Sequence, residues 1–169
     1  MIPDEIREQY GTLCEAYKVL HRKMRKLKGE YGDFFKRGVE FQKKAISANN
    51  TYLELKKTQK GGYLQLQDME KKLLEIGDMS RSFMVGLEEF KDDNIILLDK
   101  IHDFQDVIKR AGEELVKGKT NRKQMVKEMD KLEKGFENVK QNYKQCNDAF
   151  TPRNEAMIEI ISCYEDMLS

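Results

Sequence analysis

An apolar repeat with alternating spacings of four and three residues dominates the sequence. Its first stretch runs from Ile6 to Leu55, and of the fifteen repeat positions in that stretch only Gly38 is not apolar. A mean spacing of about 3.5 residues keeps one face of a helix turned toward a partner helix along its whole length. We therefore expect a helix over residues 4–58, with Pro3 suited to its first turn.

A second repeat begins at Leu66 and continues to Phe150. It crosses Gly118 and Arg122 without losing its register. An unbroken register predicts one helix over residues 64–150, with room for a kink near residue 118. In an alternative interpretation, residues 117–121 form a loop, and the chain has three helices of about 50 residues each.

The dipeptide Thr151-Pro152 follows this second repeat. Threonine is a favoured N-cap residue, and proline suits the first position of a helix. We therefore expect a short third helix over residues 153–168, with Met157, Ile161, Tyr164 and Leu168 on one face.

The composition agrees with long, thin helices. Charged residues make up 36% of the 169 residues and hydrophobic residues 39%, and the chain has only two prolines. A compact α/β enzyme with one large core has fewer charges and more residues that end strands and turns. The predicted fold is all-α: long antiparallel helices in an elongated coiled-coil bundle that forms a single domain over residues 1–169.

Several classes of protein are excluded by the sequence. The longest apolar run, residues 95–98, is far shorter than the roughly 20 residues that cross a bilayer. The first residues, MIPDE, lack the basic and apolar regions of a secretory signal. The three cysteines have no CxxC spacing, which favours a reducing compartment. We therefore expect a cytoplasmic protein.

Catalytic and cofactor signals are missing from the sequence. The two histidines, His21 and His102, lie far apart and have no metal-ligand spacing. Gly61-Gly62 joins two predicted helices, so it does not form a phosphate-binding loop after a strand. The net charge of +1 does not indicate a nucleic-acid-binding protein. We expect no enzyme activity, no cofactor, no metal site and no nucleic-acid partner.

The first two predicted helices differ in length. If residues 4–58 fold back along residues 64–150, their partner surface ends near residue 118, and the apolar positions from Met125 to Phe150 have no partner in the chain. Exposed apolar seams of this length are rare in soluble monomers. We therefore expect a homodimer through this region or through a group of additional apolar positions, namely Phe35, Val39, Ile46 and Leu53.

A row of lysines lies within the second repeat. Lys119, Lys123, Lys127 and Lys131 recur at every fourth residue, which places them on one face of a helix. Like charges at this spacing repel one another, and a bound polyanion would offset that repulsion. An anionic membrane attracts nearby basic side chains by about 1 kcal/mol each. A row of solvated charges without a ligand is the other interpretation.

Some stretches resemble BAR domains, which are crescent-shaped modules that bind curved membranes. They are MRKLKG at residues 24–29, FKDDNIILL at 90–98, ELVK at 114–117 and FENVKQNY at 136–143. The resemblance implies a homodimer that binds acidic phospholipids in a salt-dependent way, and hence a cytoplasmic protein that is peripheral at membranes. The expected third helix is shorter than in that family. By position, the distal lipid contacts implied by the resemblance are Lys117, Lys119, Arg122, Lys123, Lys127 and Lys131.

Two other functions are compatible with the same repeats. A three-helix bundle of the spectrin type, with a loop at residues 117–121, would be a scaffold that binds other proteins. A coiled-coil adaptor would pair its apolar seam with a different protein and would bind no lipid. The conformation of residues 110–126 distinguishes the bundle from the long-helix interpretation.

Overall fold

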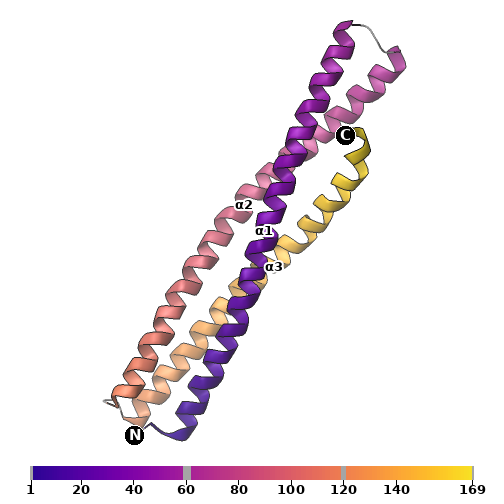
Figure 1. Cartoon of the computed structure of the whole chain (residues 1–169). Helices are drawn as coiled ribbons and strands as arrows, with labels where there is room; N and C mark the ends of the chain where they lie inside the picture. Colours follow the sequence, from indigo (N-terminus) through magenta and orange to yellow (C-terminus); the bar gives the residue numbers. More distant parts are fainter. Residues whose placement is uncertain (1, 59–61, 119–120, 169) are drawn as a thin grey trace. The chain divides into compact units, whose positions relative to one another are not determined.

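The part of the chain that the structure describes folds into three long helices (Figure 1). The computed structural model describes residues 2–58, 62–118 and 121–168, with only the backbone of Tyr63. The helices are α1 (Asp4–Thr58), α2 (Tyr63–Lys117) and α3 (Arg122–Leu168). These described residues contain no strand, so the prediction of an all-α fold is confirmed. The first helix has the bounds that the sequence predicts.

Helix α2 ends at Lys117, which contradicts the prediction of one helix over residues 64–150. Gly118 has a φ of 61°, and its N–H donates to the carbonyl of Leu115 at 3.3 Å. Glycine reaches this left-handed conformation without the steric cost that a β-carbon adds, and it commonly ends helices in this way. Gly118 therefore stops α2 where the apolar spacing alone shows no break.

Helix α3 begins with a side-chain cap. The Oδ1 atom of Asn121 accepts a hydrogen bond from the backbone N–H of Gln124 at 2.9 Å, and the Asn121 carbonyl accepts from the N–H of Met125 at 3.0 Å. Asparagine is among the best N-cap residues because it satisfies an otherwise unpaired N–H of the first turn. The structure therefore has the three long helices of the alternative interpretation, with a connection between Lys117 and Arg122.

The apolar seam has its only exposed positions at this connection. Leu115 and Met125 are buried, whereas Gly118 and Arg122 are exposed. The spacing of these four residues is the same whether the chain continues or reverses, so the register could not reveal the turn. The prediction that the seam from Met125 to Phe150 lacks a partner in the chain is wrong. Its members with at most 9% exposure are Met125, Met129, Leu132, Phe136, Val139 and Phe150.

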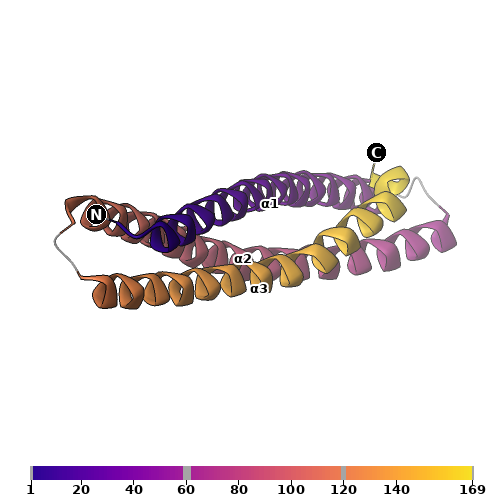
Figure 2. The same ribbon diagram turned by 90° about the horizontal axis from the view of Figure 1, so that it is seen from below.

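Pro152 lies inside α3, so the predicted separate helix over residues 153–168 is also wrong. The ribbon of α3 is unbroken from its orange to its yellow part (Figure 2). Proline lacks an N–H, and the helix tolerates the loss of one backbone bond here. The spacing of covered positions changes near Pro152. The steps from Cys146 to Phe150 and from Phe150 to Asn154 are both four residues, where the repeat would alternate four with three. Such an extra step locally unwinds a coiled coil.

The contacts divide the chain into two compact units, and each unit contains part of all three helices. The first unit comprises Met1–Gly29 and Asp92–Ala149, and the second comprises Glu30–Lys91 and Phe150–Ser169. Each unit is a three-helix assembly with its own apolar interior.

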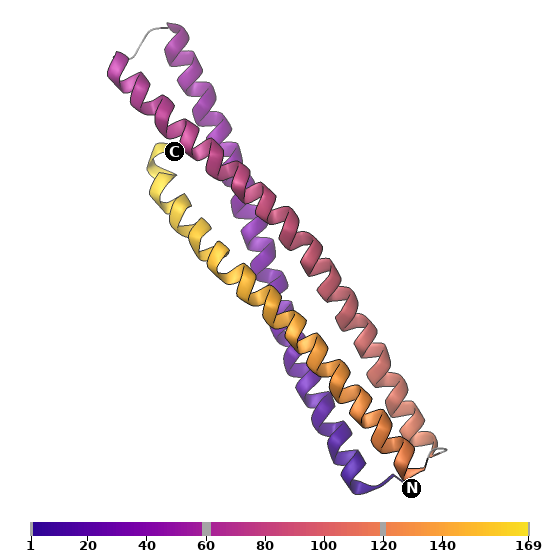
Figure 3. The same cartoon turned by 180° about the vertical axis from the view of Figure 1, so that it is seen from behind.

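In the first unit, tyrosine hydroxyls of α1 bind carbonyls of α2. Tyr10 donates to the carbonyl of Ile108 at 3.0 Å, and Tyr17 donates to that of Ile101 at 3.3 Å. One heptad forward on α1 thus corresponds to one heptad back on α2, so these helices run in opposite directions. Figure 3 shows the three helices of this unit side by side, and the ring of Phe104 connects α2 to Tyr17 at 5.9 Å.

The next layer of this ladder is different. One further heptad step along both helices leads to Met24 on α1 and Asn94 on α2. Met24 is buried, and the Oδ1 atom of Asn94 is buried without a hydrogen-bond partner among the described residues. Burying a polar atom without a partner costs free energy. This layer therefore lacks the tyrosine–carbonyl bond of its neighbours and contains an unsatisfied acceptor.

The second unit has an aromatic centre. Tyr31 donates to the carbonyl of Leu87 at 3.1 Å, in the same register as the tyrosines of the first unit. The rings of Phe34, Phe90 and Phe150, one from each helix, pack edge-on, with centroids 5.4–6.4 Å apart. Edge-to-face packing of this kind is the favoured aromatic geometry. Toward the end of α3, another apolar cluster is formed by Phe41, Ile76 and Leu168.

Candidate interaction surfaces

The structure does not bring all six predicted lipid contacts together. Lys119 lies outside the described residues. Lys117 forms an ion pair with Glu114 on its own helix at 3.8 Å, and Arg122 forms one with Glu5 of α1 at 2.8 Å. Both pairs are largely exposed, and such pairs contribute little to stability. They nevertheless neutralise two of the charges that were assigned to a membrane.

The other three predicted residues lie in one row on α3. Lys123, Lys127 and Lys131 are exposed and are four residues apart. None of them forms an ion pair with another described residue. We call these residues the lysine row. It is the part of the predicted basic site that remains free to bind an anion.

A groove of about 730 Å³ lies between α2 and α3 near their connection, within the first unit. Helix α2 contributes one wall and the first turns of α3 the other. We call it the turn groove, and it is lined by Val107, Arg110, Ala111, Glu114, Leu115, Gln124, Met125, Lys127, Glu128, Met129, Lys131 and Leu132.

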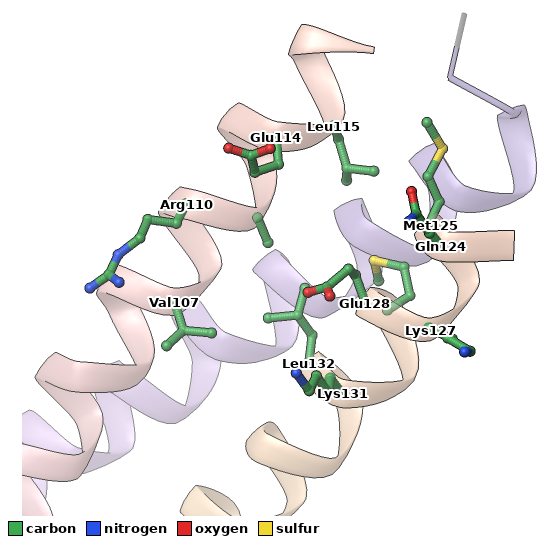
Figure 4. A pocket seen from close by; sticks show the side chains of 12 residues that line it. Val107, Arg110, Glu114, Leu115, Gln124, Met125, Lys127, Glu128, Lys131 and Leu132 are labelled. Carbon is green, nitrogen blue, oxygen red and sulfur yellow. The ribbon is translucent and has the colours of Figure 1, made fainter. Parts of the chain in front are cut away.

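The charged side chains of the turn groove point in different directions (Figure 4). Arg110 and Lys127 extend away from the space between the helices, to opposite sides, whereas Glu128 projects into that space. Val107, on the α2 wall, is 45% exposed. The groove therefore combines an exposed apolar side chain with a carboxylate, and two of its three basic residues, Arg110 and Lys127, point outward.

A second candidate surface lies on α1 in the second unit. Phe35, Ile46 and Leu53 are 48%, 55% and 51% exposed, and Val39 is half-buried. These four residues, which we call the α1 stripe, continue the four- and three-residue spacing on a face next to the buried seam. Three heptads earlier on α1, the equivalent positions are Cys14, Lys18, Arg25 and Gly32. The apolar stripe is therefore particular to the second half of α1.

A hollow of about 540 Å³ between α2 and α3 of the second unit contains Arg153. The guanidinium of Arg153 lies 5.0 Å from the centroid of the Phe90 ring and donates to Glu89 at 3.1 Å. Its Nη1 atom would be 3.5 Å from a β-carbon at Gly86. Arg153 is therefore occupied by contacts within the chain.

The titratable groups with shifted pKa values favour their neutral forms. The pKa of Tyr10 is raised to about 12, mainly by burial and also by the hydrogen bond and the charge of the nearby Cys14 thiol. Burial is also the main cause of the raised pKa of Tyr17, and of the Cys146 thiol, to which the charge of Asp93 adds. A thiol or phenol held neutral is a poor nucleophile or base.

The described residues contain neither a candidate metal site nor a candidate membrane-spanning helix. Over the described ranges, no group of three or more His, Cys, Asp or Glu side chains is placed to hold a metal ion. None of the helices, over the same residues, has an apolar stretch long enough to cross a bilayer.

The sequence predicted the lysine row and the additional apolar positions of α1, but not the turn groove. The groove exists because α3 folds back beside α2, and the signals for that reversal were Gly118 and Asn121. Comparisons with protein-family models, with curated proteins and with solved structures find no match for this chain.

Proposed function

We propose that this protein is a non-enzymatic helical scaffold that binds another protein through the turn groove. The observation that supports this proposal is the carboxylate of Glu128 between two helices, in a groove that also contains the apolar side chains of Val107 and Leu132. Grooves between helices commonly accept an amphipathic helix. The partner in this proposal is an amphipathic helix with one basic side chain on its apolar face, placed to meet Glu128.

A synthetic helical peptide is the probe for this proposal. Two 18-residue peptides of the same Leu- and Ala-rich pattern, one with a central Lys and one with a central Glu, are titrated against the full chain. The methyl NMR signals of Met125 and Met129 report binding. We expect the Lys peptide to bind roughly tenfold more tightly than the Glu peptide, as for one charge-assisted contact.

The Glu128→Lys variant tests the role of the carboxylate. It should reverse the preference between the two peptides, whereas Glu137→Lys, at an exposed α3 position outside the groove, should not. No shift of either methionine signal at millimolar peptide, or the same preference in Glu128→Lys, argues against the groove as a protein-binding site.

A second candidate function is binding to anionic membranes, and the lysine row favours it. Three exposed lysines in one row, each attracted by roughly 1 kcal/mol, give weak and reversible binding that a second copy would strengthen. The likeness to BAR domains favours the same function. The sequence predicted a third helix that is shorter than in that family, but α3 has 47 residues, so this difference does not exist.

Vesicle sedimentation tests this second candidate. The chain should sediment with phosphatidylserine vesicles at low salt and dissociate at about 0.5 M salt, where the Debye length falls to roughly 4 Å. Combined Lys123→Glu, Lys127→Glu and Lys131→Glu changes should abolish sedimentation. Undiminished sedimentation of this triple variant excludes the lysine row as the contact. A control replaces three lysines of α1, Lys23, Lys26 and Lys28, in the same way.

A further inference from the structure

The α1 stripe shares no residue with the turn groove or the lysine row, and it supports a separate inference. Three of its residues, Phe35, Ile46 and Leu53, expose about half of their surface. The charged residues Asp33, Lys36, Glu54 and Lys57 lie beside the stripe on the same helix. These four charged residues form no ion pair with any other described residue. We propose that the α1 stripe pairs with the α1 stripe of a second copy of this chain, with the two α1 helices antiparallel.

The spacing of the stripe fits this pairing. The positions on this face of α1 alternate between four- and three-residue steps that read the same in both directions: Phe35, Val39, Gln42, Ile46, Asn49 and Leu53. An antiparallel pair therefore sets Phe35 against Leu53 of the second copy, Val39 against Asn49, and Gln42 against Ile46. Each layer contains at least one apolar side chain, and every contact occurs twice because of the twofold symmetry.

Four of the charges beside the stripe are complementary in the same register, whereas the exposed Lys43 comes close to the level of Lys43 of the second copy. Lys36 lies about 3 Å along the helix axis from the level of Glu54 of the second copy, at 1.5 Å per residue, and Lys57 lies equally close to the level of Asp33. Symmetry doubles both pairs. In a parallel pairing in register, the charged flanks of the two α1 helices would instead lie on opposite sides of the seam, so Lys36 and Glu54 could not meet. The charges therefore favour the antiparallel orientation over the parallel one.

Gln42 and Asn49 add specificity to the pairing. A polar residue within an apolar seam lowers stability but disfavours other registers, since shifting the helices would bury it against different neighbours. The α1 stripe would thus bind the α1 stripe of a second copy more tightly than it would bind an arbitrary amphipathic helix. A different protein that covers the stripe would leave the isolated chain monomeric.

Sedimentation equilibrium on the full chain tests the proposal between about 1 and 100 μM. We expect a monomer–dimer equilibrium, in which Ile46→Glu raises the dissociation constant by at least roughly 100-fold because it places two charges in the seam. Val85→Glu is the matched control, because Val85 is 62% exposed in the same unit but lies on α2, outside the stripe. It should change the constant by less than about twofold. Far-UV circular dichroism verifies that both variants remain helical.

A charge exchange tests the register. Lys36→Glu alone should weaken the dimer by roughly tenfold, because two exposed pairs become repulsive. Adding Glu54→Lys should restore the affinity of the wild-type chain. A loss that the second change does not repair is incompatible with the Lys36–Glu54 pair.

Disulfide formation distinguishes the two orientations. In a chain with Cys14→Ala, Cys146→Ala and Cys163→Ser, the variants Val39→Cys and Asn49→Cys should cross-link with each other when mixed. Each alone should cross-link slowly, because equal positions lie about 15 Å apart along the axis. A monomer over the whole concentration range, a dimer that Ile46→Glu leaves intact, or fast cross-linking of Val39→Cys alone overturns the proposal. The Glu128→Lys variant should dimerise normally, so failure of the turn groove and failure of the stripe are separate results.

Discussion

The side chain of Tyr10 occupies the space that a side chain at Gly112 would need. A β-carbon on Gly112 would collide with the hydroxyl oxygen of Tyr10, which donates to the carbonyl of Ile108 at 3.0 Å. The absence of a side chain on α2 is therefore what lets the tyrosine of α1 reach the α2 backbone.

Replacement of Gly112 by alanine should lower the free energy of unfolding by about 1–2 kcal/mol, because the clash displaces Tyr10. Alanine would otherwise stabilise a helix interior by up to about 1 kcal/mol. Gly11→Ala is the matched control, since nothing lies within 4 Å of a β-carbon there, and it should stabilise the protein. Urea unfolding measures both. If Gly112→Ala stabilises as Gly11→Ala does, the close contact is not present in solution.

Stability should fall at high pH through Tyr10. Its pKa is raised from 10.0 to about 12 in the folded chain, mainly by burial, so the unfolded chain loses this proton first. The contribution is complete below about pH 10 and is lost as the pH rises toward 12. The urea midpoint should therefore drop between about pH 10 and pH 12, and it should drop less in Tyr10→Phe. Equal drops in both proteins would show that other groups cause the loss.

The turn at Gly118 should be sensitive to a β-carbon. Gly118→Ala places an L-residue at a φ of 61°, which costs about 1 kcal/mol or more. Gly29→Ala, in ordinary helix with open space around it, should not destabilise the protein. Thermal unfolding followed at 222 nm compares the two variants. An unchanged midpoint in Gly118→Ala would favour a continuous helix through this residue.

Pro152→Ala distinguishes a proline inside a helix from one at a helix start. Inside α3, the replacement restores a backbone hydrogen bond and should raise the free energy of unfolding by about 2 kcal/mol. At a first helical position, proline is well tolerated and the change should be within about 0.5 kcal/mol. Urea unfolding of the wild-type chain and of Pro152→Ala measures this difference. A change in the free energy of unfolding within about 0.5 kcal/mol contradicts an uninterrupted α3.

Asn94→Leu should stabilise the protein by about 1 kcal/mol, because the buried Oδ1 atom has no hydrogen-bond partner among the described residues. The same change at Asn50, which is exposed on α1, should have little effect. Chemical unfolding of both variants provides the comparison. A loss of stability in Asn94→Leu would indicate that Asn94 is satisfied in solution.

The apolar repeat predicted the composition of the interior well. Every position of the first repeat from Ile6 to Leu55 is at least partly covered, as are those from Leu66 to Leu115. The repeat could not predict the direction of the chain, because a heptad register passes through a turn unchanged when the turn contains a suitable number of residues. Gly118 and Asn121 determined the reversal, and each acts through local backbone chemistry that hydrophobic spacing does not describe.

The candidate surfaces show a similar limit. Helical spacing correctly placed Lys123, Lys127 and Lys131 on one exposed face. It could not predict that Arg122 pairs with Glu5, since that contact joins residues far apart in the sequence. The tyrosine–carbonyl bonds were also beyond prediction, because the apolar repeat shows only that a tyrosine is covered, not where its hydroxyl points.

The bonds from Tyr10 and Tyr17 to α2 also limit how this chain can change in length. An insertion or deletion of one residue between Tyr10 and Tyr17 would rotate one hydroxyl by about 100° away from its carbonyl, while the other stayed in place. Gains and losses of single residues are therefore tolerable only at the two connections between helices, whereas a change within a helix would have to add or remove whole heptads in both partners. Related chains of different length should consequently differ by multiples of seven residues in α1 and α2.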